Sequence, residues 1–104
     1  MIYNLVTQDI VPGKMAEYGE IAAKEMMPTF AKLGMKLVAS WHGYTGNVNE
    51  VYLLFVYNDL AEFQKMREAQ RKDADYQRNG VKVNALITRQ TRTLLEPNAW
   101  SPMK

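Results

Sequence analysis

The segment Val48–Tyr57 (VNEVYLLFVY) constrains the fold of this chain more than any other part of the sequence. Successive side chains of a β-strand point to opposite faces of the sheet. Here both sets are apolar: one face would carry Val51, Leu53 and Phe55, and the other Tyr52, Leu54 and Val56. A sheet with one face in water alternates hydrophobic and polar residues. Both faces of this sheet must therefore be covered.

The first third of the chain predicts a strand, a turn and a helix. Residues Ile2–Ile10 are rich in β-branched and aromatic types, as in a strand. Val11–Lys14 (VPGK) suits a type II turn, because proline presets the second position and glycine accepts the third. From Met15 to Leu33 apolar residues recur every three or four positions, which predicts a helix that ends at Gly34. Pro28 predicts a kink near Met27.

The rest of the chain predicts a hairpin, two helical stretches and a last strand. Met35–Thr45 and Val48–Tyr57 would pair around a two-residue turn at Gly46-Asn47. Asp59 and Glu62 fit a capping box. Asp73 would cap a further short helix that holds Tyr76, and Gly80 would interrupt this helix. Ile87–Glu96 would form the last strand, which ends before Pro97.

This order, β-α-β-β-α-β, predicts an α+β domain of the ferredoxin-like kind with a four-stranded antiparallel sheet. Right-handed crossovers place both helical stretches on one face. The opposite face would expose more apolar surface than a monomer normally leaves in water. Packing it against a second copy across a two-fold axis would cover it, with about 800 Å² buried per subunit. We therefore expect a homodimer, with one domain over residues 1–97 and a tail, 98–104, that contacts the partner subunit.

Composition excludes several classes of function. The chain has 104 residues, no cysteine and a single histidine, so we expect no disulfide, no thiol chemistry and no metal site. Its net charge of +2 comes from interspersed charges rather than a basic stripe, which argues against nucleic-acid binding. No apolar run approaches the roughly 18 residues of a membrane span. We expect a cytoplasmic protein that binds neither membrane nor nucleic acid and carries no cofactor.

Several short motifs resemble the NIPSNAP family, and together they cover nearly the whole chain. They are Ile2-Tyr3-Asn4-Leu5, Val11–Lys14, Gly34–Val38 before Trp41, Asn49-Glu50-Val51, Tyr57–Leu60, Arg67-Glu68-Ala69, Asp73 with Tyr76, and Gln90 near Leu95-Glu96-Pro97. The resemblance implies the dimeric α+β barrel superfamily, in which the sheets of two ferredoxin-like subunits pack face to face. That superfamily includes cofactor-independent monooxygenases, haem-degrading enzymes, lactone isomerases and ligand-sensing regulators. The family itself has no settled biochemical activity.

The sequence departs from the family pattern at four polar positions. Family members often carry an acid and an arginine in the first strand, where Asn4 and Val6 stand here. A histidine frequent in the third strand is replaced by Leu53, and a serine near the end of the last strand by Thr91. Any chemistry that those positions perform elsewhere would be lost here.

His42 and Trp41 are the first candidate site residues. His42 is the weak candidate for a general base, since histidine alone titrates near neutrality. The two-residue hairpin would pair it with Val51, on a largely apolar face; the alternative is a half-buried histidine at the dimer seam. Trp41 would then lie near Tyr52 on the other face, and if that face met the helices it would line the helix–sheet cleft.

Arg92 and Tyr57 complete the set of candidate ligand-binding residues. Arg89 and Arg92 would lie on opposite faces of the last strand, so at least one points to a covered side and needs a partner. That partner is either an anionic ligand, held by the guanidinium fork, or a carboxylate of the chain. Tyr57 could supply a phenolic donor to a pocket.

Three functions are compatible with these residues. The first is a homodimer that binds a small, partly apolar molecule in a helix–sheet cleft. The second is a cofactor-independent monooxygenase or isomerase, in which His42 or a tyrosine removes a proton. The third is a structural or interaction protein without a ligand, with the Trp100 tail clasping the partner subunit.

Overall fold

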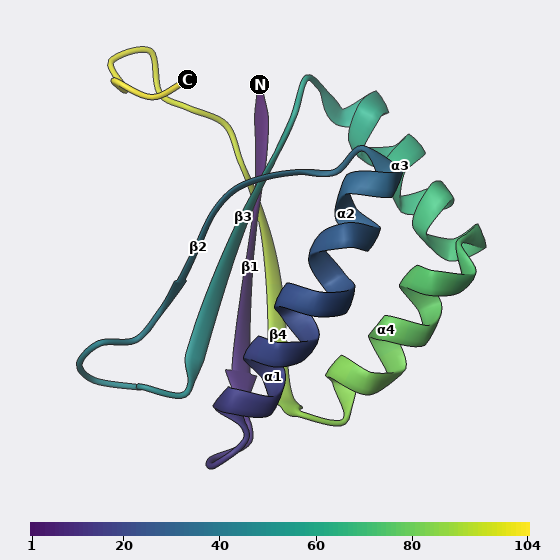
Figure 1. Ribbon diagram of the computed structural model, residues 1–104. Helices are drawn as coiled ribbons and strands as arrows, with labels where there is room; N and C mark the ends of the chain where they lie inside the picture. Colours follow the sequence, from purple (N-terminus) through teal and green to yellow (C-terminus); the bar gives the residue numbers. More distant parts are fainter.

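A four-stranded antiparallel sheet forms one layer of the protein, and helices cover one of its faces (Figure 1). The computed structural model describes residues 1–104. The strands are β1 (Ile2–Ile10), β2 (Lys36–His42), β3 (Glu50–Tyr57) and β4 (Ile87–Leu95), and their order in the sheet is β2-β3-β1-β4. The ferredoxin-like α+β fold expected from the sequence is confirmed.

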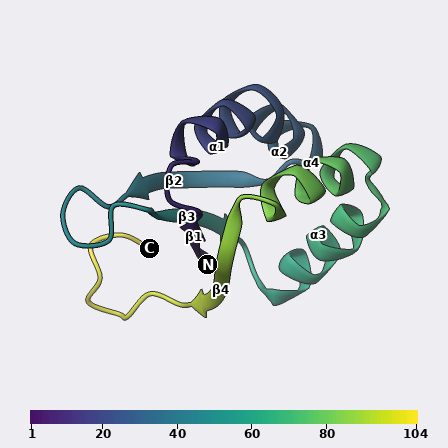
Figure 2. The ribbon, with the colours of Figure 1, turned by 90° about the horizontal axis from the view of Figure 1, so that it is seen from below.

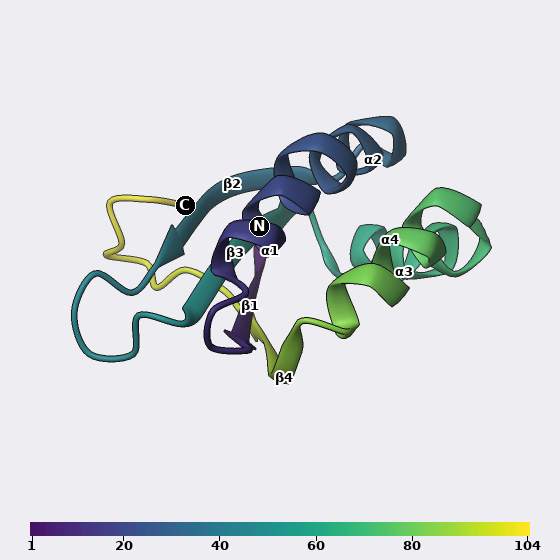
Figure 3. The same ribbon diagram turned by 60° about the horizontal axis from the view of Figure 1, so that its bottom comes forward.

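Five helical segments lie on the same side of the sheet (Figure 2). They are α1 (Met15–Ile21), η1 (Ala22–Met26), α2 (Met27–Leu33), α3 (Leu60–Lys72) and α4 (Ala74–Asn84). Figure 3 shows α3 and α4 beside the long rod that α1, η1 and α2 form. No helix has the length and the apolar character that crossing a membrane requires.

The turn and the helix end predicted in the first third of the chain are confirmed. Gly13 has φ +87°, and the Lys14 N–H donates to the Val11 carbonyl at 3.0 Å, as a type II turn requires. Gly34 has φ +79°. The Met35 N–H donates to the Phe30 carbonyl at 2.9 Å, so the helix ends in a Schellman-type cap.

The helix irregularity near Met27 takes the form of a π-helical turn. Segment η1 is a π-helix, and the Met27 N–H donates to Ala22 O, five residues back. Pro28, which follows at once, cannot donate a backbone hydrogen bond. The wider turn lets the chain continue as a helix through Met26 into α2 where an α-helical ladder would be broken. π-helical turns of this kind are frequent at functional sites.

The hairpin has the predicted register but shorter strands. His42 pairs with Val51 and Trp41 with Tyr52, as a two-residue turn at Gly46-Asn47 requires. The strands nevertheless stop at His42 and resume at Glu50, so residues 43–49 form a longer loop. The register shift in this pair lies between Leu37 and Ala39, and therefore leaves the His42 pairing unchanged.

The two predicted caps of the later helices are confirmed, and the predicted interruption at Gly80 is wrong. The Asp59 carboxylate accepts from the Glu62 N–H at 2.8 Å, and the Glu62 carboxylate accepts from the Asn58 N–H at 2.8 Å. Asp73 accepts from the Tyr76 N–H at 2.9 Å. Helix α4 runs through Gly80 to Asn84, because the glycine adopts ordinary helical geometry there.

The two faces of the sheet differ in cover. Val51, Leu53, Phe55 and Tyr57 of β3 are buried under the helices. On the opposite face Trp41 is 53% exposed. The tail, residues 98–104, runs back toward the N-terminus (Figure 1), where the Tyr3 hydroxyl donates to the Lys104 carbonyl at 2.9 Å. Trp100 in this tail is 81% exposed.

Candidate ligand-binding cavity

A cavity of about 210 Å³ lies between the helix-covered face of the sheet and helices α2, α3 and α4. Strands β1, β3 and β4 supply one wall, and the helices with the π-turn supply the other. Drug-sized ligands occupy cavities of about 300–1,000 Å³, so this cavity suits a smaller molecule. It is partly open to solvent along β4, whose residues after Ile87 are exposed.

The apolar part of the lining comes from core residues. Phe30 and Phe55 meet edge to face, with ring centroids 5.2 Å apart. Leu53 extends this surface along β3, and Met26 and Met35 contribute flexible thioethers that can adapt to a ligand. All five side chains belong to the main core cluster, so the apolar wall is part of the folded core.

An amide chain crosses the floor of the cavity. The Tyr18 hydroxyl donates to Oε1 of Gln8, and Nε2 of Gln8 donates to Oε1 of Gln90 at 2.8 Å. Burial raises the pKa of Tyr18 to about 12, so the phenol stays protonated and remains a donor at any ordinary pH. The chain fixes the orientation of the Gln8 amide, because its oxygen is committed to Tyr18.

Asn4 is the one buried side chain with an unsatisfied polar atom. Only 6% of the residue is exposed, and its Oδ1 accepts no hydrogen bond. An unpaired buried acceptor costs about 1–3 kcal/mol. Asn4 faces the cavity beside Phe55 and Leu94, its cross-strand neighbours. A ligand O–H or N–H in the cavity would satisfy this oxygen.

Two arginines and two tyrosines, Arg67, Arg92, Tyr57 and Tyr76, also line the cavity. Partial burial of its guanidinium, and then the nearby charge of Arg67, lower the pKa of Arg92 from its ordinary value. Burial raises the pKa of Tyr57 to about 12, with Tyr76 as the next contribution. All four side chains line the cavity, yet no aspartate or glutamate does. The cavity lining therefore includes two positively charged side chains and no carboxylate.

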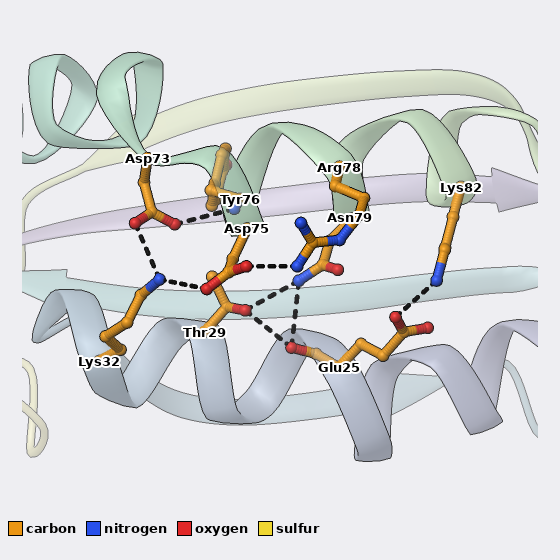
Figure 4. Close-up of polar contacts among 9 residues, drawn as sticks. All are labelled: Glu25, Thr29, Lys32, Asp73, Asp75, Tyr76, Arg78, Asn79 and Lys82. Carbon is orange, nitrogen blue, oxygen red and sulfur yellow. Dashed lines mark hydrogen bonds and ion pairs between the residues drawn. The ribbon is translucent and has the colours of Figure 1, made fainter.

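A polar seam holds the helices together above the cavity (Figure 4). The Asn79 amide of α4 donates to Thr29 Oγ1 at 2.8 Å and to the Glu25 carbonyl at 3.1 Å. The Thr29 hydroxyl also donates to the Glu25 carbonyl, at 2.9 Å. The π-turn places Glu25 at this junction, where its carboxylate pairs with Lys82 at 2.6 Å. Asn79 and Thr29 also line the cavity, so the seam forms part of its roof.

A second set of contacts ties the far end of α2 to the start of α4. The Lys32 ammonium lies 2.9 Å from the Asp73 carboxylate and 2.5 Å from that of Asp75 (Figure 4). Arg78 pairs with Asp75 from the same helix. Hydrogen bonds from Lys32 are the leading cause that lowers the pKa values of Asp73 and Asp75.

The structure separates the four sequence-predicted site residues into two pairs. Tyr57 and Arg92 line the cavity, whereas Trp41 and His42 do not. His42 shares the covered face with Val51 but lies exposed at the hairpin end of β2. Trp41 points to the face without helices, so the condition under which it would line the helix–sheet cleft is not met.

Sequence reasoning missed the amides of the cavity. Asn4 and Gln8 lie four residues apart in β1, which places them on the same face of the sheet as the buried Val6. Polar residues alternating with buried apolar ones along a central strand were the available signal. Arg67 and Asn79 carried no such signal, because their helical faces are set by the packing of α3 and α4.

No group of three or more His, Asp or Glu side chains in the structure is placed to hold a metal ion. The fold and the cavity together define a ferredoxin-like α+β domain with a small cleft between helices and sheet. The NIPSNAP family model matches residues 3–102, and the chain belongs to the NIPSNAP family.

Solved structures of the family share this fold. An uncharacterized NIPSNAP domain protein from Burkholderia xenovorans is 24% identical with a TM-score of 0.90, over 98% of this chain and 99% of that one. A NIPSNAP family protein of unknown function from Agrobacterium tumefaciens is 21% identical with a TM-score of 0.90, over 100% of this chain and 94% of that one.

More distant structures have the same fold with other descriptions. A protein from Nitrosomonas europaea, described as a candidate antibiotic biosynthesis monooxygenase, is 11% identical with a TM-score of 0.71, over 93% of this chain and 98% of that one. A comparison with curated proteins finds no match. At these identities the structural likeness establishes the fold alone.

Proposed function

We propose that this NIPSNAP-family protein is a homodimer that binds a small, partly apolar molecule in the helix–sheet cavity of each subunit. The observation that carries the proposal is the cavity of about 210 Å³, in which an apolar wall faces a buried acceptor, Asn4 Oδ1, that has no partner in the chain. Buried polar atoms without partners are rare in folded proteins and call for an explanation. A ligand donor supplies one.

Dimerisation is proposed from the face of the sheet that has no helices. By register and alternation this face carries a group of apolar side chains, Leu5, Trp41, Tyr52, Val56 and Leu95, around the buried Tyr3 and Leu54. Polar residues, among them Thr7, Lys36 and Arg89, lie beside them. Trp41 and Leu95 are more than two-fifths exposed. A second copy packed on this face would bury them in a closed, isologous interface. A cytoplasmic location stays a prediction from the sequence.

A cofactor-independent monooxygenase or isomerase is the alternative that the wider superfamily suggests. Such chemistry needs a base within reach of the substrate. Tyr57 lines the cavity, but burial raises its pKa to about 12, which keeps it protonated. His42 does not line the cavity. The geometry therefore supports binding better than proton abstraction.

The third hypothesis, an interaction protein clasped by its tail, predicts that residues 98–104 are needed for assembly. In the structure the tail contacts its own subunit through Tyr3 and Lys104. Under our proposal, deletion of residues 98–104 leaves dimerisation intact, as sedimentation of the truncated protein would show.

Native mass spectrometry of protein freshly purified from its own host tests the binding function. We expect a small molecule to co-purify and to be released on denaturation. Gly80→Leu provides the matched variant, because a side chain added at Gly80 meets no atom within 4 Å and would grow at the cavity wall. Gly19→Leu, in the exposed part of α1, is the control. Equal ligand occupancy in wild type and Gly80→Leu would place the ligand elsewhere.

A further inference from the structure

Two arginines line the cavity, the half-buried Arg67 and the more exposed Arg92, and neither has a carboxylate partner. Arg67 donates to Oε1 of Gln70 at 2.9 Å, a neutral acceptor. Arg92 takes part in no ion pair, and neither does Arg67, although five ion pairs form elsewhere in the structure. Both residues line the same cavity, Arg67 from α3 and Arg92 from β4.

Placing two guanidinium groups together without an anion is electrostatically unfavourable. Partial burial is the main cause of the lowered pKa of Arg92, and the charge of Arg67 adds to it, so the two groups lie near enough to interact. No carboxylate lines the cavity to offset them. A bound anion would reverse the sign of this interaction, and guanidinium forks hold a carboxylate in a planar, bidentate arrangement.

The rest of the site favours a carboxylate over a phosphate. Phosphate sites commonly use the free N–H groups of a helix N-terminus. The N-termini of α3 and α4 are already occupied by the side chains of Asp59 and Asp73. The other hydrogen-bonding groups that line the cavity with the arginines include the phenols of Tyr57 and Tyr76. Apolar side chains make up much of the remaining lining.

We propose that the ligand is a small carboxylic acid, bound as its anion by Arg67 and Arg92, with its apolar body against Phe30 and Phe55. This inference rests on the proposed function, because it names the chemical class of the molecule that the cavity holds. The small volume limits the body to about the size of a single ring, below the range of drug-sized ligands.

Benzoate and benzamide test the inference, because the two probes match in shape and differ in charge. Binding is followed at pH 7 and low salt by NMR chemical-shift changes of backbone amides at Leu53, Phe55 and Asn79. A charge-assisted hydrogen bond contributes more binding free energy than a neutral one, and the difference corresponds to about a tenfold change in affinity. We therefore expect benzoate to bind about tenfold more tightly than benzamide, and added salt to narrow the gap.

Matched arginine variants assign the effect to the cavity. Arg92→Gln and Arg67→Gln should each remove most of the preference for benzoate. Arg89→Gln and Arg71→Gln are the controls, since Arg89 lies on the other face of β4 and Arg71 lies outside this cavity. Both controls should retain the full preference, and a thermal melt of each variant shows that it is folded.

Three outcomes would overturn the inference. Equal affinity of the wild-type protein for both probes would eliminate the carboxylate and leave the proposed function standing. A preference lost equally in Arg89→Gln would mean general electrostatic attraction rather than a site. Absence of shift changes at the cavity with either probe would remove the proposed function as well. The wild-type comparison needs no variant, so it decides the question even where a variant is unfolded.

Discussion

The two faces of the sheet differ in where they carry unexpected side chains: two amides lie among the core residues of the covered face, and exposed apolar side chains lie on the other face. On the central strand β1, the helix-covered face carries the amides Asn4 and Gln8 beside Val6, while the face without helices carries Leu5 and Tyr3, whose hydroxyl donates to the tail. A sheet with one face in water normally buries its apolar side chains and exposes its polar ones. Covered amides indicate a site, and uncovered aromatic and aliphatic side chains indicate an interface. Strand β1 therefore contributes to both proposed roles, ligand binding on its covered face and dimerisation on the other.

The largest effect is expected on the face without helices. Trp41→Glu would place an unpaired charge in the proposed dimer interface, which costs several kcal/mol when desolvated. We expect the dimer dissociation constant to rise at least about a hundredfold. Sedimentation velocity at micromolar concentration measures it.

Leu60→Glu is the control for this substitution. Leu60 is as exposed as Trp41, at 53%, but it lies at the start of α3, away from the sheet face. It should leave the dimer unchanged. A wild-type chain that sediments as a monomer, or a Trp41→Glu variant that stays dimeric, would show that this face is not the interface.

On the covered face, Gln8→Leu should lower the free energy of unfolding by about 1–3 kcal/mol. Leucine cannot accept from Tyr18 or donate to Gln90, so the buried phenol is left without its acceptor. Urea denaturation measures the change. Gln64→Leu, at an exposed position of α3, is the control and should have little effect. Unchanged stability of Gln8→Leu would mean that the amide chain is not a structural unit.

Asn4→Leu should change the free energy of unfolding in the opposite direction to Gln8→Leu. Because Asn4 Oδ1 has no partner, replacing the amide with an apolar side chain removes a desolvation cost rather than a hydrogen bond. We expect stability to rise by about 1 kcal/mol while affinity for the co-purifying ligand falls. Residues retained for binding at the expense of stability show this trade-off. A destabilised Asn4→Leu protein that keeps its ligand would make Asn4 a core residue.

The architecture could be predicted from the sequence where local chemistry decides it. Pro12-Gly13 specified the turn, Gly34 the helix end, and Asp59 with Glu62 the start of α3, because each acts through its own backbone. Gly80 was misread for the opposite reason. Its neighbours in α4 pack on the core through Val83 and Tyr76, and this tertiary packing overrides the low helix propensity of glycine.

The candidate site was harder to predict because it depends on which sheet face the helices cover. The hairpin register correctly paired His42 with Val51, yet it could not say which face would be covered. That choice moved Trp41 away from the cavity. In the sequence Asn4 stands out only as a departure from the family pattern, whereas the structure places it among the cavity residues. Arg67 joins Arg92 only through the packing of α3, which no spacing in the sequence reveals.

The smallest effect concerns the contacts that hold the helical cover in place. The hydrogen bonds that Lys32 donates to Asp73 and Asp75 lower the pKa values of both carboxyl groups, and the same bonds raise the pKa of Lys32. A carboxylate with a lowered pKa stabilises the fold above its unfolded value, near 3.8, and loses this contribution as the pH falls through the lowered value. The raised pKa of Lys32 stabilises the fold at pH values below the unfolded pKa of 10.5. This contribution is lost as the pH rises through the raised pKa of the folded protein.

Lys32→Met should therefore lower the melting temperature most between these limits. The difference from wild type should shrink below about pH 4 and also at high salt, since the ion pairs are at the surface. Lys24→Met is the control, because Lys24 pairs with Glu20 within one helix and connects nothing across the cover. A melting difference for Lys32→Met that persisted unchanged at acid pH would mean that packing of the lysine stem, not its charge, joins α2 to α4.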